Sequence, residues 1–132
     1  MTGQNEDLVQ YRLRRSFETL EDAQILAKAE RWNACVNRLY YACFYAVTAL
    51  LSQVGLYSSK HSGVRSLFNL HFVKTDIVQK SYATTYNDLF EQRQESDYVD
   101  FVNFESSQIR PLIPKAKSFV ELIANIVDRN RR

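Results

Sequence analysis

Residues 33–54 read NACVNRLYYACFYAVTALLSQV, and this stretch decides the fold. Its apolar residues recur at spacings of three and four and cover nearly the whole circumference of a helix. They are Val36, Leu39, Ala42, Cys43, Ala46, Val47, Leu50 and Leu51. A helix that is apolar on all sides contacts neighbours in several directions, so we expect it at the centre of the protein. Gly55 follows it and is expected to end it in the left-handed conformation.

The segments on either side carry one-sided helical patterns. We predict helices over residues 6–29, 60–72 and 76–97, and a last helix whose start stays open because Pro111 and Pro114 fit either a kink or a late beginning. The first and last of these have apolar stripes of Val9, Leu13, Phe17, Leu20, Ala23 and Ala27, and of Ile109, Ile113, Ala116, Val120, Ile123 and Val127. Short connections between such helices indicate an all-α, up-and-down bundle of about five antiparallel helices, in a single domain over residues 1–132.

Several polar residues stand where helices are expected to begin. Asn33 is predicted to cap the central helix, and Ser58 or Ser59 the helix that begins near residue 60. Asp76 and Gln79 have the spacing of a capping box for the helix over residues 76–97.

Composition excludes several classes of protein. Three Gly and two Pro in 132 residues are too few for a β-sandwich or a Gly-rich phosphate loop, and a net charge of +2 does not by itself indicate nucleic-acid binding. Cys35 and Cys43 lie about 12 Å apart along one predicted helix, too far for a disulfide. No Cys/His spacing suggests zinc, and the apolar run over residues 39–51 is short for a membrane span. We therefore expect a cytoplasmic protein with no metal, no cofactor and no membrane contact.

The apolar stripe of the helix over residues 76–97 ends on a cation. Arg93 continues the spacing of the inward-facing residues, so its side chain is expected to face the bundle or a cleft. An unpaired guanidinium there is costly and needs a carboxylate or an anionic ligand. Asp97 lies four residues later on the same face. Either the two form a structural ion pair that pins the end of the helix, or Arg93 is held ready for a phosphate group.

A polar stripe also runs along the central helix. Four hydroxyl-bearing residues share the face of Arg38 at spacings of three and four, namely Tyr41, Tyr45, Thr48 and Ser52. The stripe is either a solvated side of the helix or a groove in which Arg38 and hydroxyl groups meet a polar ligand or a second subunit. Two inward-leaning arginines, Arg38 and Arg93, each need a counter-charge, which favours the groove.

The chain has two histidines, the side chains that titrate near neutral pH. His61 stands at the predicted start of a helix and is a candidate base or phosphate contact. His71 lies near the end of the same helix, where a cation favours the helix dipole, and we interpret it as structural.

Three short motifs follow one another along the chain. They are RLYYACFYA over residues 38–46, KHSGV over 60–64 and RQESDY over 93–98. Together they resemble the HEPN family, whose small single-domain prokaryotic members read R-x-Y-Y-A-x-F, then K-H-x-G, then R-x-x-x-D-Y. The resemblance covers roughly residues 20–127.

The resemblance implies a helical bundle that often forms a homodimer. Many members are metal-independent ribonucleases that serve as toxins, and others partner a small nucleotidyltransferase domain that acts as antitoxin. The ribonuclease members carry an Arg with a His a few residues later. Arg93 matches the Arg, but positions 98–100 hold Tyr98, Val99 and Asp100, and no His follows His71. The catalytic pair is therefore incomplete.

Three functions stay open at this point. The first is a HEPN-type protein that binds RNA, a nucleotide or a nucleotidyltransferase partner without cleavage, through Arg38, Tyr41, Arg93, Asp97 and Tyr98. The second is an active ribonuclease toxin in which Arg93 stabilises the phosphorane charge and His61 replaces the missing base. The third is a structural dimer held by an Arg–Asp network. The tyrosine stripe and the aromatic residues over 98–104 favour a homodimer, because exposed apolar patches usually mark contacts.

Overall fold

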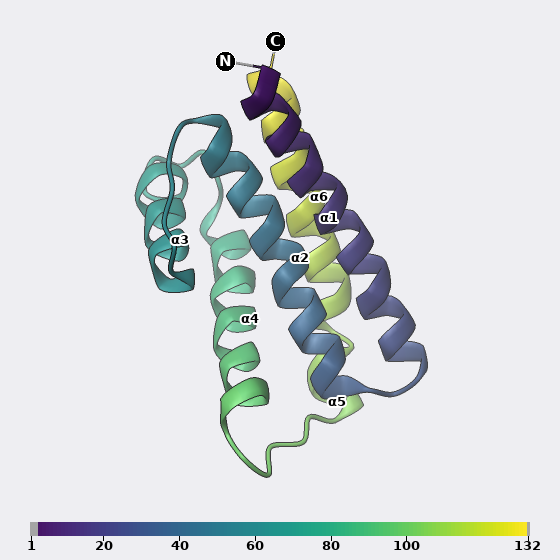
Figure 1. Cartoon of the computed structure of the whole chain (residues 1–132). Coiled ribbons are helices and arrows are strands. Elements are labelled where there is room, and N and C mark those ends of the chain that lie inside the picture. Colours follow the sequence, from purple (N-terminus) through teal and green to yellow (C-terminus); the bar gives the residue numbers. More distant parts are fainter. Residues whose placement is uncertain (1–2, 132) are drawn as a thin grey trace.

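The computed structural model describes residues 3–131, apart from the side chains of residues 3, 4 and 96. These residues contain no strand. They form α1 (Gly3–Lys28), α2 (Trp32–Gln53), α3 (His61–Phe68), the π-helical segment η1 (Asn69–Val73), α4 (Lys80–Tyr98), α5 (Ser106–Ile109) and α6 (Leu112–Asn130). The predicted all-α bundle is confirmed (Figure 1). The five expected helices are α1, α2, α3 with η1, α4 and α6, and α5 is an additional single turn.

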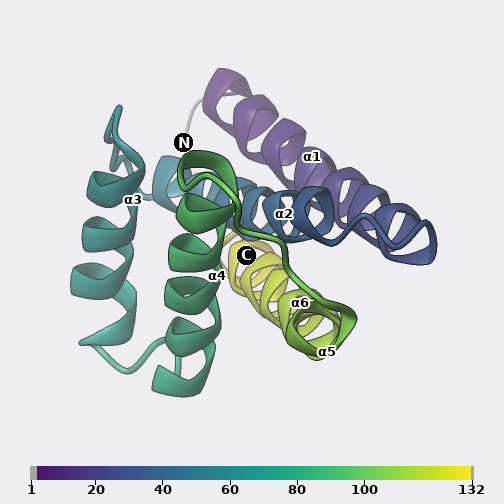
Figure 2. The same cartoon turned by 90° about the horizontal axis from the view of Figure 1, so that it is seen from below.

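The central position predicted for residues 33–54 is that of α2. This helix packs against α1, α3, α4, α5 and α6, and from below it is seen among α1, α4 and α6 (Figure 2). Twelve of its residues are buried, including the free thiols of Cys35 and Cys43. By length and composition alone α2 could cross a membrane, but 61% of its most apolar window is buried against the rest of the bundle. Such burial is typical of the core helix of a globular domain.

The stripe of α1 differs from the prediction at one position. Phe17 is exposed, whereas Ser16 is buried and its hydroxyl donates a hydrogen bond of 2.6 Å to the carbonyl oxygen of Ala42 on α2. The small side chains of Ser16 and Ala42 let the two backbones approach closely, and a phenylalanine ring would hold them apart. Hydrophobicity alone predicts that Phe17, one position later, faces the core instead of Ser16.

The capping residues predicted for α2 and α3 are wrong. Asn33 lies inside the first turn of α2, whose N-cap is Arg31. The chain enters α3 from an extended Lys60, which makes no side-chain cap. The hydroxyl of Ser58 instead accepts a hydrogen bond of 3.2 Å from the backbone N–H of Lys60, within the preceding turn. Ser59 is not the N-cap either.

The predicted capping box of Asp76 and Gln79 is also wrong. α4 begins at Lys80, and Asp76 lies in the preceding turn with a φ of 63°. A capping box does occur at α5, where the side chains of Glu105 and Gln108 bond to each other's backbone N–H groups. Short polar residues mark turns and helix starts alike, so their spacing alone did not separate the two.

The two helix ends that depend on special residues have clear geometry. Gly55 adopts a φ of 79°, and the N–H of Leu56 donates to the carbonyl of Leu51 over 2.8 Å, which is a left-handed helix end as predicted. At the other end of the chain, α6 begins late, at Leu112. Pro111 precedes it and Pro114 lies in its first turn, where a proline removes no N–H that the helix needs.

Candidate functional site

Arg93 lies on α4 with only 5% of its surface exposed. Its guanidinium carbon is 4.9 Å from the ring centre of Tyr40, 5.8 Å from that of Tyr41 and 5.5 Å from that of Tyr98. Two of these rings come from α2 and the third from the last residue of α4. The faces of aromatic rings attract a cation, so the three rings hold the guanidinium in place without neutralising its charge.

The carboxylate of Asp97 only partly pairs with Arg93. The Nη1 atom of Arg93 is 3.6 Å from Oδ2 of Asp97, longer than the 2.7–2.9 Å usual for a strong hydrogen bond between such groups. Both carboxylate oxygens of Asp97 instead accept from Nδ2 of Asn37, at 3.0 and 3.3 Å. The buried Nε of Arg93 has no hydrogen-bond partner among the described residues. A purely structural ion pair would leave fewer guanidinium donors unused, which weakens that interpretation.

Arg38 joins the same group of side chains from α2. Its Nε and Nη2 both donate to Oδ1 of Asn37, at 3.1 and 2.8 Å, and its guanidinium carbon lies 5.0 Å from the ring centre of Tyr41. Asn37 therefore stands between Arg38 and Asp97 and uses its carbonyl for one and its amide for the other. This bridge links the first half of α2 to the end of α4.

His61, the first residue of α3, packs against the same rings. Its Nδ1 atom is 2.7 Å from the hydroxyl of Tyr40, and its ring lies 5.7 Å from that of Tyr40 and 5.6 Å from that of Tyr41. Burial lowers the pKa of His61, and the charge of Arg93 lowers it further, so the imidazole is neutral at pH 7.

The hydrogen bond between Tyr40 and His61 assigns the tautomer of the imidazole. Tyr40 is fully buried, and burial raises the pKa of its phenol far above the usual value, so the hydroxyl keeps its proton. The buried phenol of Tyr86 also interacts with this hydroxyl but brings a proton of its own, so Nδ1 of His61 is the acceptor that leaves neither phenol proton unpaired. Tyr40 is therefore the donor, and the proton of the neutral imidazole is on Nε2. In this state Nε2 donates a hydrogen bond and cannot act as a base.

The structure brings together the six residues singled out from the sequence. Arg38, His61 and Arg93 lie against the ring of Tyr41, and Asp97 and Tyr98 lie beside Arg93. We call this group the Arg93 cluster: Arg38, Tyr41, His61, Arg93, Asp97 and Tyr98. Two members of its surroundings were missed, Asn37 and Tyr40. Asn37 precedes Arg38 and lies one helical turn before Tyr41, and Tyr40 directly precedes Tyr41. The sequence therefore places both residues near the cluster, but only the fold shows which side chains they contact.

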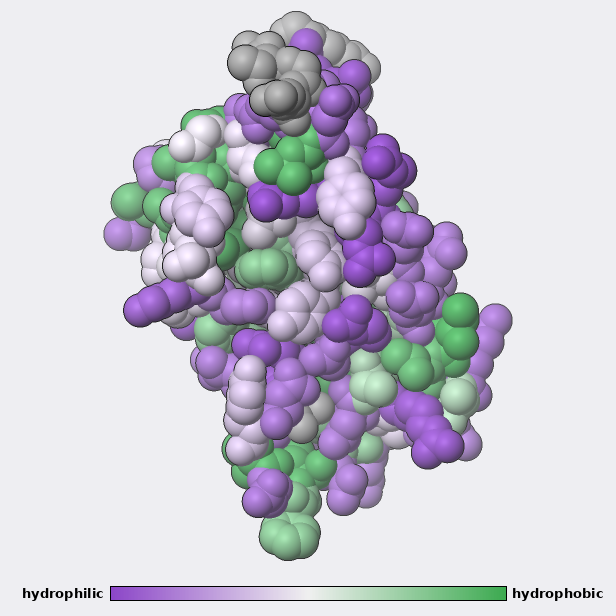
Figure 3. Space-filling view, in the orientation of Figure 1, coloured by the Kyte–Doolittle hydropathy of each residue, from purple (hydrophilic) through white to green (hydrophobic). Residues whose placement is uncertain are grey.

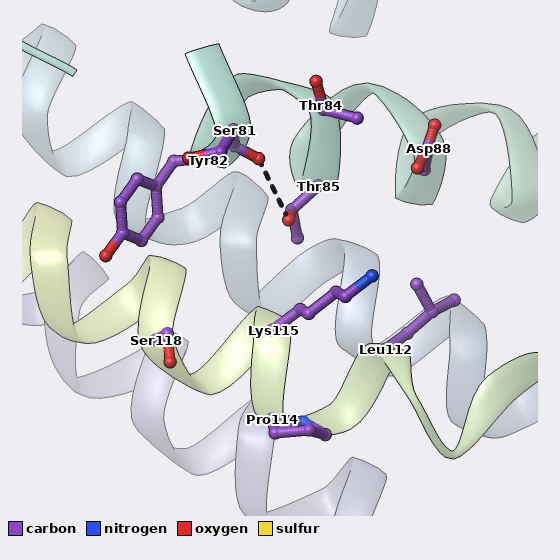
Figure 4. A pocket seen from close by; sticks show the side chains of 9 residues that line it. All are labelled: Ser81, Tyr82, Thr84, Thr85, Asp88, Leu112, Pro114, Lys115 and Ser118. Atoms are coloured by element: carbon purple, nitrogen blue, oxygen red, sulfur yellow. Dashed lines mark hydrogen bonds between the residues drawn. The ribbon is translucent and has the colours of Figure 1, made fainter. Parts of the chain in front are cut away.

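A separate groove of about 600 Å³ lies between α4 and α6 (Figure 4). Lys115 reaches from α6 toward α4, where the hydroxyl of Thr85 donates to the carbonyl of Ser81 over 3.4 Å. No member of the Arg93 cluster lines this groove. Within residues 3–131 as described, no group of three or more His, Cys, Asp or Glu side chains is arranged to hold a metal ion.

Comparison with known proteins identifies the family. The model of the HEPN domain matches residues 9–127. This chain belongs to the HEPN domain family. A UPF0332 protein of Thermotoga maritima is 43% identical over 130 residues, which cover 98% of each chain. Two proteins of Methanocaldococcus jannaschii are also similar. "Putative toxin MJ0142" is 29% identical over 108 residues, 82% of this chain and 74% of the relative. "Putative toxin MJ0605" is 31% identical over 106 residues, 80% and 78% of the two chains.

Proposed function

We propose that this HEPN domain protein binds RNA through phosphate contacts at the Arg93 cluster and that the isolated chain does not cleave it. The observation that carries the proposal is the state of Arg93. Its guanidinium is held by three rings, has one long contact to Asp97 and has an unpaired Nε. A phosphate group offers anionic oxygens that a planar guanidinium binds in pairs.

The neighbours of Arg93 suit a nucleotide better than a bare anion. Arg38 supplies a second guanidinium, and Nε2–H of His61 supplies a neutral donor. The ring of Tyr98, 73% exposed beside Arg93, offers a face on which an unpaired base can stack. Phosphate contacts together with aromatic stacking are typical of RNA recognition.

The same geometry disfavours cleavage. Metal-independent cleavage needs a base beside the 2′-hydroxyl group. His61, the candidate for that role, accepts the hydrogen bond of Tyr40 at Nδ1 and, in the tautomer that this bond favours, carries its own proton on Nε2. A phenol such as that of Tyr98 is a poor base at neutral pH. Arg93 is therefore left as a binding cation without a general base.

A partner protein is part of this proposal. Two relatives carry the name "Putative toxin", and a toxin is ordinarily inhibited by an antitoxin, which supports a partner of that type. A nucleotidyltransferase partner stays a prediction from the resemblance. We also propose a homodimer formed through the turn after α4, where Val99 and Phe101 are exposed.

Binding of a fluorescently labelled RNA, measured by anisotropy, tests the proposal. We expect Arg93→Ala to lower the affinity roughly tenfold or more, because a charged donor pair to phosphate is lost. Lys117→Gln removes an exposed cation on α6, away from the cluster, and is the matched control, which should bind as the wild type does. Circular dichroism shows whether each variant is folded. Equal affinities of the wild type and folded Arg93→Ala would refute the proposal.

A further inference from the structure

A second hollow lies beside the Arg93 cluster, where α1, α2 and the segment before α3 meet. It has a volume of about 160 Å³. Phe44, Tyr45 and Tyr57 provide aromatic walls, and Arg12, Thr48 and Ser58 provide polar atoms. Mostly apolar walls with a few polar groups are typical of ligand sites, and the small volume of this hollow limits an occupant to a single small group. We call this hollow the Tyr57 pocket.

Aromatic rings connect the Tyr57 pocket to the Arg93 cluster. Phe44 lines the pocket and stacks on His61 with 4.4 Å between ring centres. Tyr45 also lines the pocket, and its ring centre is 6.0 Å from that of Tyr41 in the cluster. In the space-filling view, rings of intermediate hydropathy, drawn nearly white, gather over α2 in the middle of the face, among strongly hydrophilic side chains (Figure 3). The two sites therefore share one continuous wall.

Arginines alternate with these rings. The guanidinium of Arg15 lies 5.4 Å from the ring centre of Tyr45, and that of Arg38 lies 5.0 Å from that of Tyr41. Arg12 is fixed at the pocket by its Nη1, which donates to Oγ of Ser52 over 2.6 Å and to the carbonyl of Thr48 over 3.3 Å. None of these three arginines forms an ion pair within the described part of the chain. These guanidinium groups give the face positive charge that attracts an anionic ligand.

The end of α2 shapes the pocket. The left-handed Gly55 turns the chain back so that Leu56, Tyr57 and Ser58 reach the side of α2. Tyr57 is 78% exposed, so its ring forms an open lip and contributes little to the core. An aromatic ring held open to solvent beside a cationic surface can stack with a base.

We infer that the nucleic acid is single-stranded and runs from the Arg93 cluster along the half-buried side of α2 that carries Tyr41 and Tyr45 into the Tyr57 pocket, which holds an unpaired base. This inference rests on the proposed function. Arginines that form no ion pair, alternating with rings, fit a strand whose phosphates and bases are both accessible. In a duplex the bases are stacked inside and cannot reach either the rings or a concave pocket. The charge disfavours an apolar protein segment as the occupant.

The test compares a labelled single-stranded RNA with the same RNA annealed to its complement. The single strand should bind the wild-type protein at least tenfold more tightly. Tyr57→Ala should weaken binding of the single strand roughly tenfold, the loss typical of one stacked base. Arg15→Gln should lower the slope of log affinity against log salt by about 0.7, the value for one phosphate of a single strand. Ile25→Ala and Lys117→Gln, exposed positions elsewhere, serve as controls.

The outcomes separate this inference from the proposed function. If Arg93→Ala loses binding while Tyr57→Ala and Arg15→Gln bind as the wild type does, the inferred path is wrong and the Arg93 site stands. Equal affinity for single strand and duplex also overturns the path. A change in the molecular mass of Tyr57→Ala in solution, with unchanged RNA affinity, would assign the pocket to a protein interface instead. If the wild type binds neither RNA, both proposals fail.

Discussion

Arg93 shows how a buried charge can be retained without a full counter-charge. Its guanidinium contacts three tyrosine rings, and its one carboxylate neighbour is engaged by Asn37. The attraction of the ring faces offsets part of the free energy of hydration that the cation loses on burial. It does not replace the hydrogen bonds that the guanidinium N–H groups made with water. The residue is stable enough to be held in place and still has donors for a ligand.

Asp97→Asn separates a ligand site from a structural ion pair. Because the contact to Arg93 is 3.6 Å long and Asp97 is exposed, we expect the free energy of unfolding in urea to fall by about 1 kcal/mol or less. Asp100→Asn, in the following turn, is the matched control. A loss of about 3–5 kcal/mol would show that the pair is structural, because this is the cost of leaving a buried charge without its partner.

His61 should make stability depend on pH. Burial and the charge of Arg93 lower the pKa of His61 in the folded protein below its ordinary value of about 6.5. As the pH falls below that value, the unfolded chain takes up a proton that the folded chain does not, so the free energy of unfolding decreases. His61→Gln should reduce this decrease between about pH 7 and pH 5, measured by urea denaturation. The matched change His71→Gln, at an exposed position, should keep it. If the free energy of unfolding of His61→Gln depended on pH as that of the wild type does, the lowered pKa of His61 would be contradicted.

At the scale of elements, α2 has two roles. Its buried side forms the core, and its other side carries Arg38 and the rings of Tyr41, Phe44 and Tyr45, which belong to the two proposed sites. The segment after α4 is attached to the beginning of this helix by Asn33. Its Nδ2 donates to the carbonyl of Val102 over 2.8 Å, and its Oδ1 accepts from the N–H of Phe104 over 2.9 Å. α2 thus positions the site in two ways. Its own side chains form part of the Arg93 cluster, and Asn33 holds the turn that follows Tyr98.

Asn33→Ala should release this turn. The change removes both hydrogen bonds and leaves buried backbone groups unpaired, so we expect a loss of about 1–3 kcal/mol in the free energy of unfolding. Amide hydrogen exchange should become faster over residues 99–105 and stay unchanged in α6. Asn103→Ala, an exposed position in the same segment, is the control and should leave both measurements as in the wild type. Unchanged exchange over residues 99–105 would show that Asn33 does not hold the turn.

At the scale of the whole molecule, the parts predictable from the sequence were those set by local pattern. The all-round apolarity of α2, the glycine at its end and the stripe that places Arg93 inward all depend on neighbours within a few turns. Ser16 could not be chosen over Phe17, because the close approach of α1 to α2 decides it. Asn33, Asn37 and Tyr40 were assigned other roles or none, because their partners lie on distant segments. The local pattern therefore identified the members of the Arg93 cluster but not the contacts that join them.

The proposed homodimer makes Phe101 the residue to change. Its ring is fully exposed, and its φ of 66° is strained for a residue with a large side chain. Phe101→Gly should leave the free energy of unfolding within about 1 kcal/mol, since relief of strain offsets the flexibility of glycine. It should shift the mass measured by light scattering from dimer toward monomer. Ile77→Ser, an exposed apolar position on another turn, is the control. A monomeric wild type at tens of micromolar would contradict the dimer.

The central claim is that this HEPN domain holds RNA at Arg93 without cutting it. The most direct test incubates an end-labelled, unstructured RNA with an excess of protein in EDTA and analyses the mixture on native and denaturing gels in parallel. The account predicts that the wild type shifts the RNA on the native gel and leaves it full length on the denaturing gel, and that Arg93→Ala does not shift it. Cleavage that disappears in Arg93→Ala, or no shift with the wild type, would contradict the account.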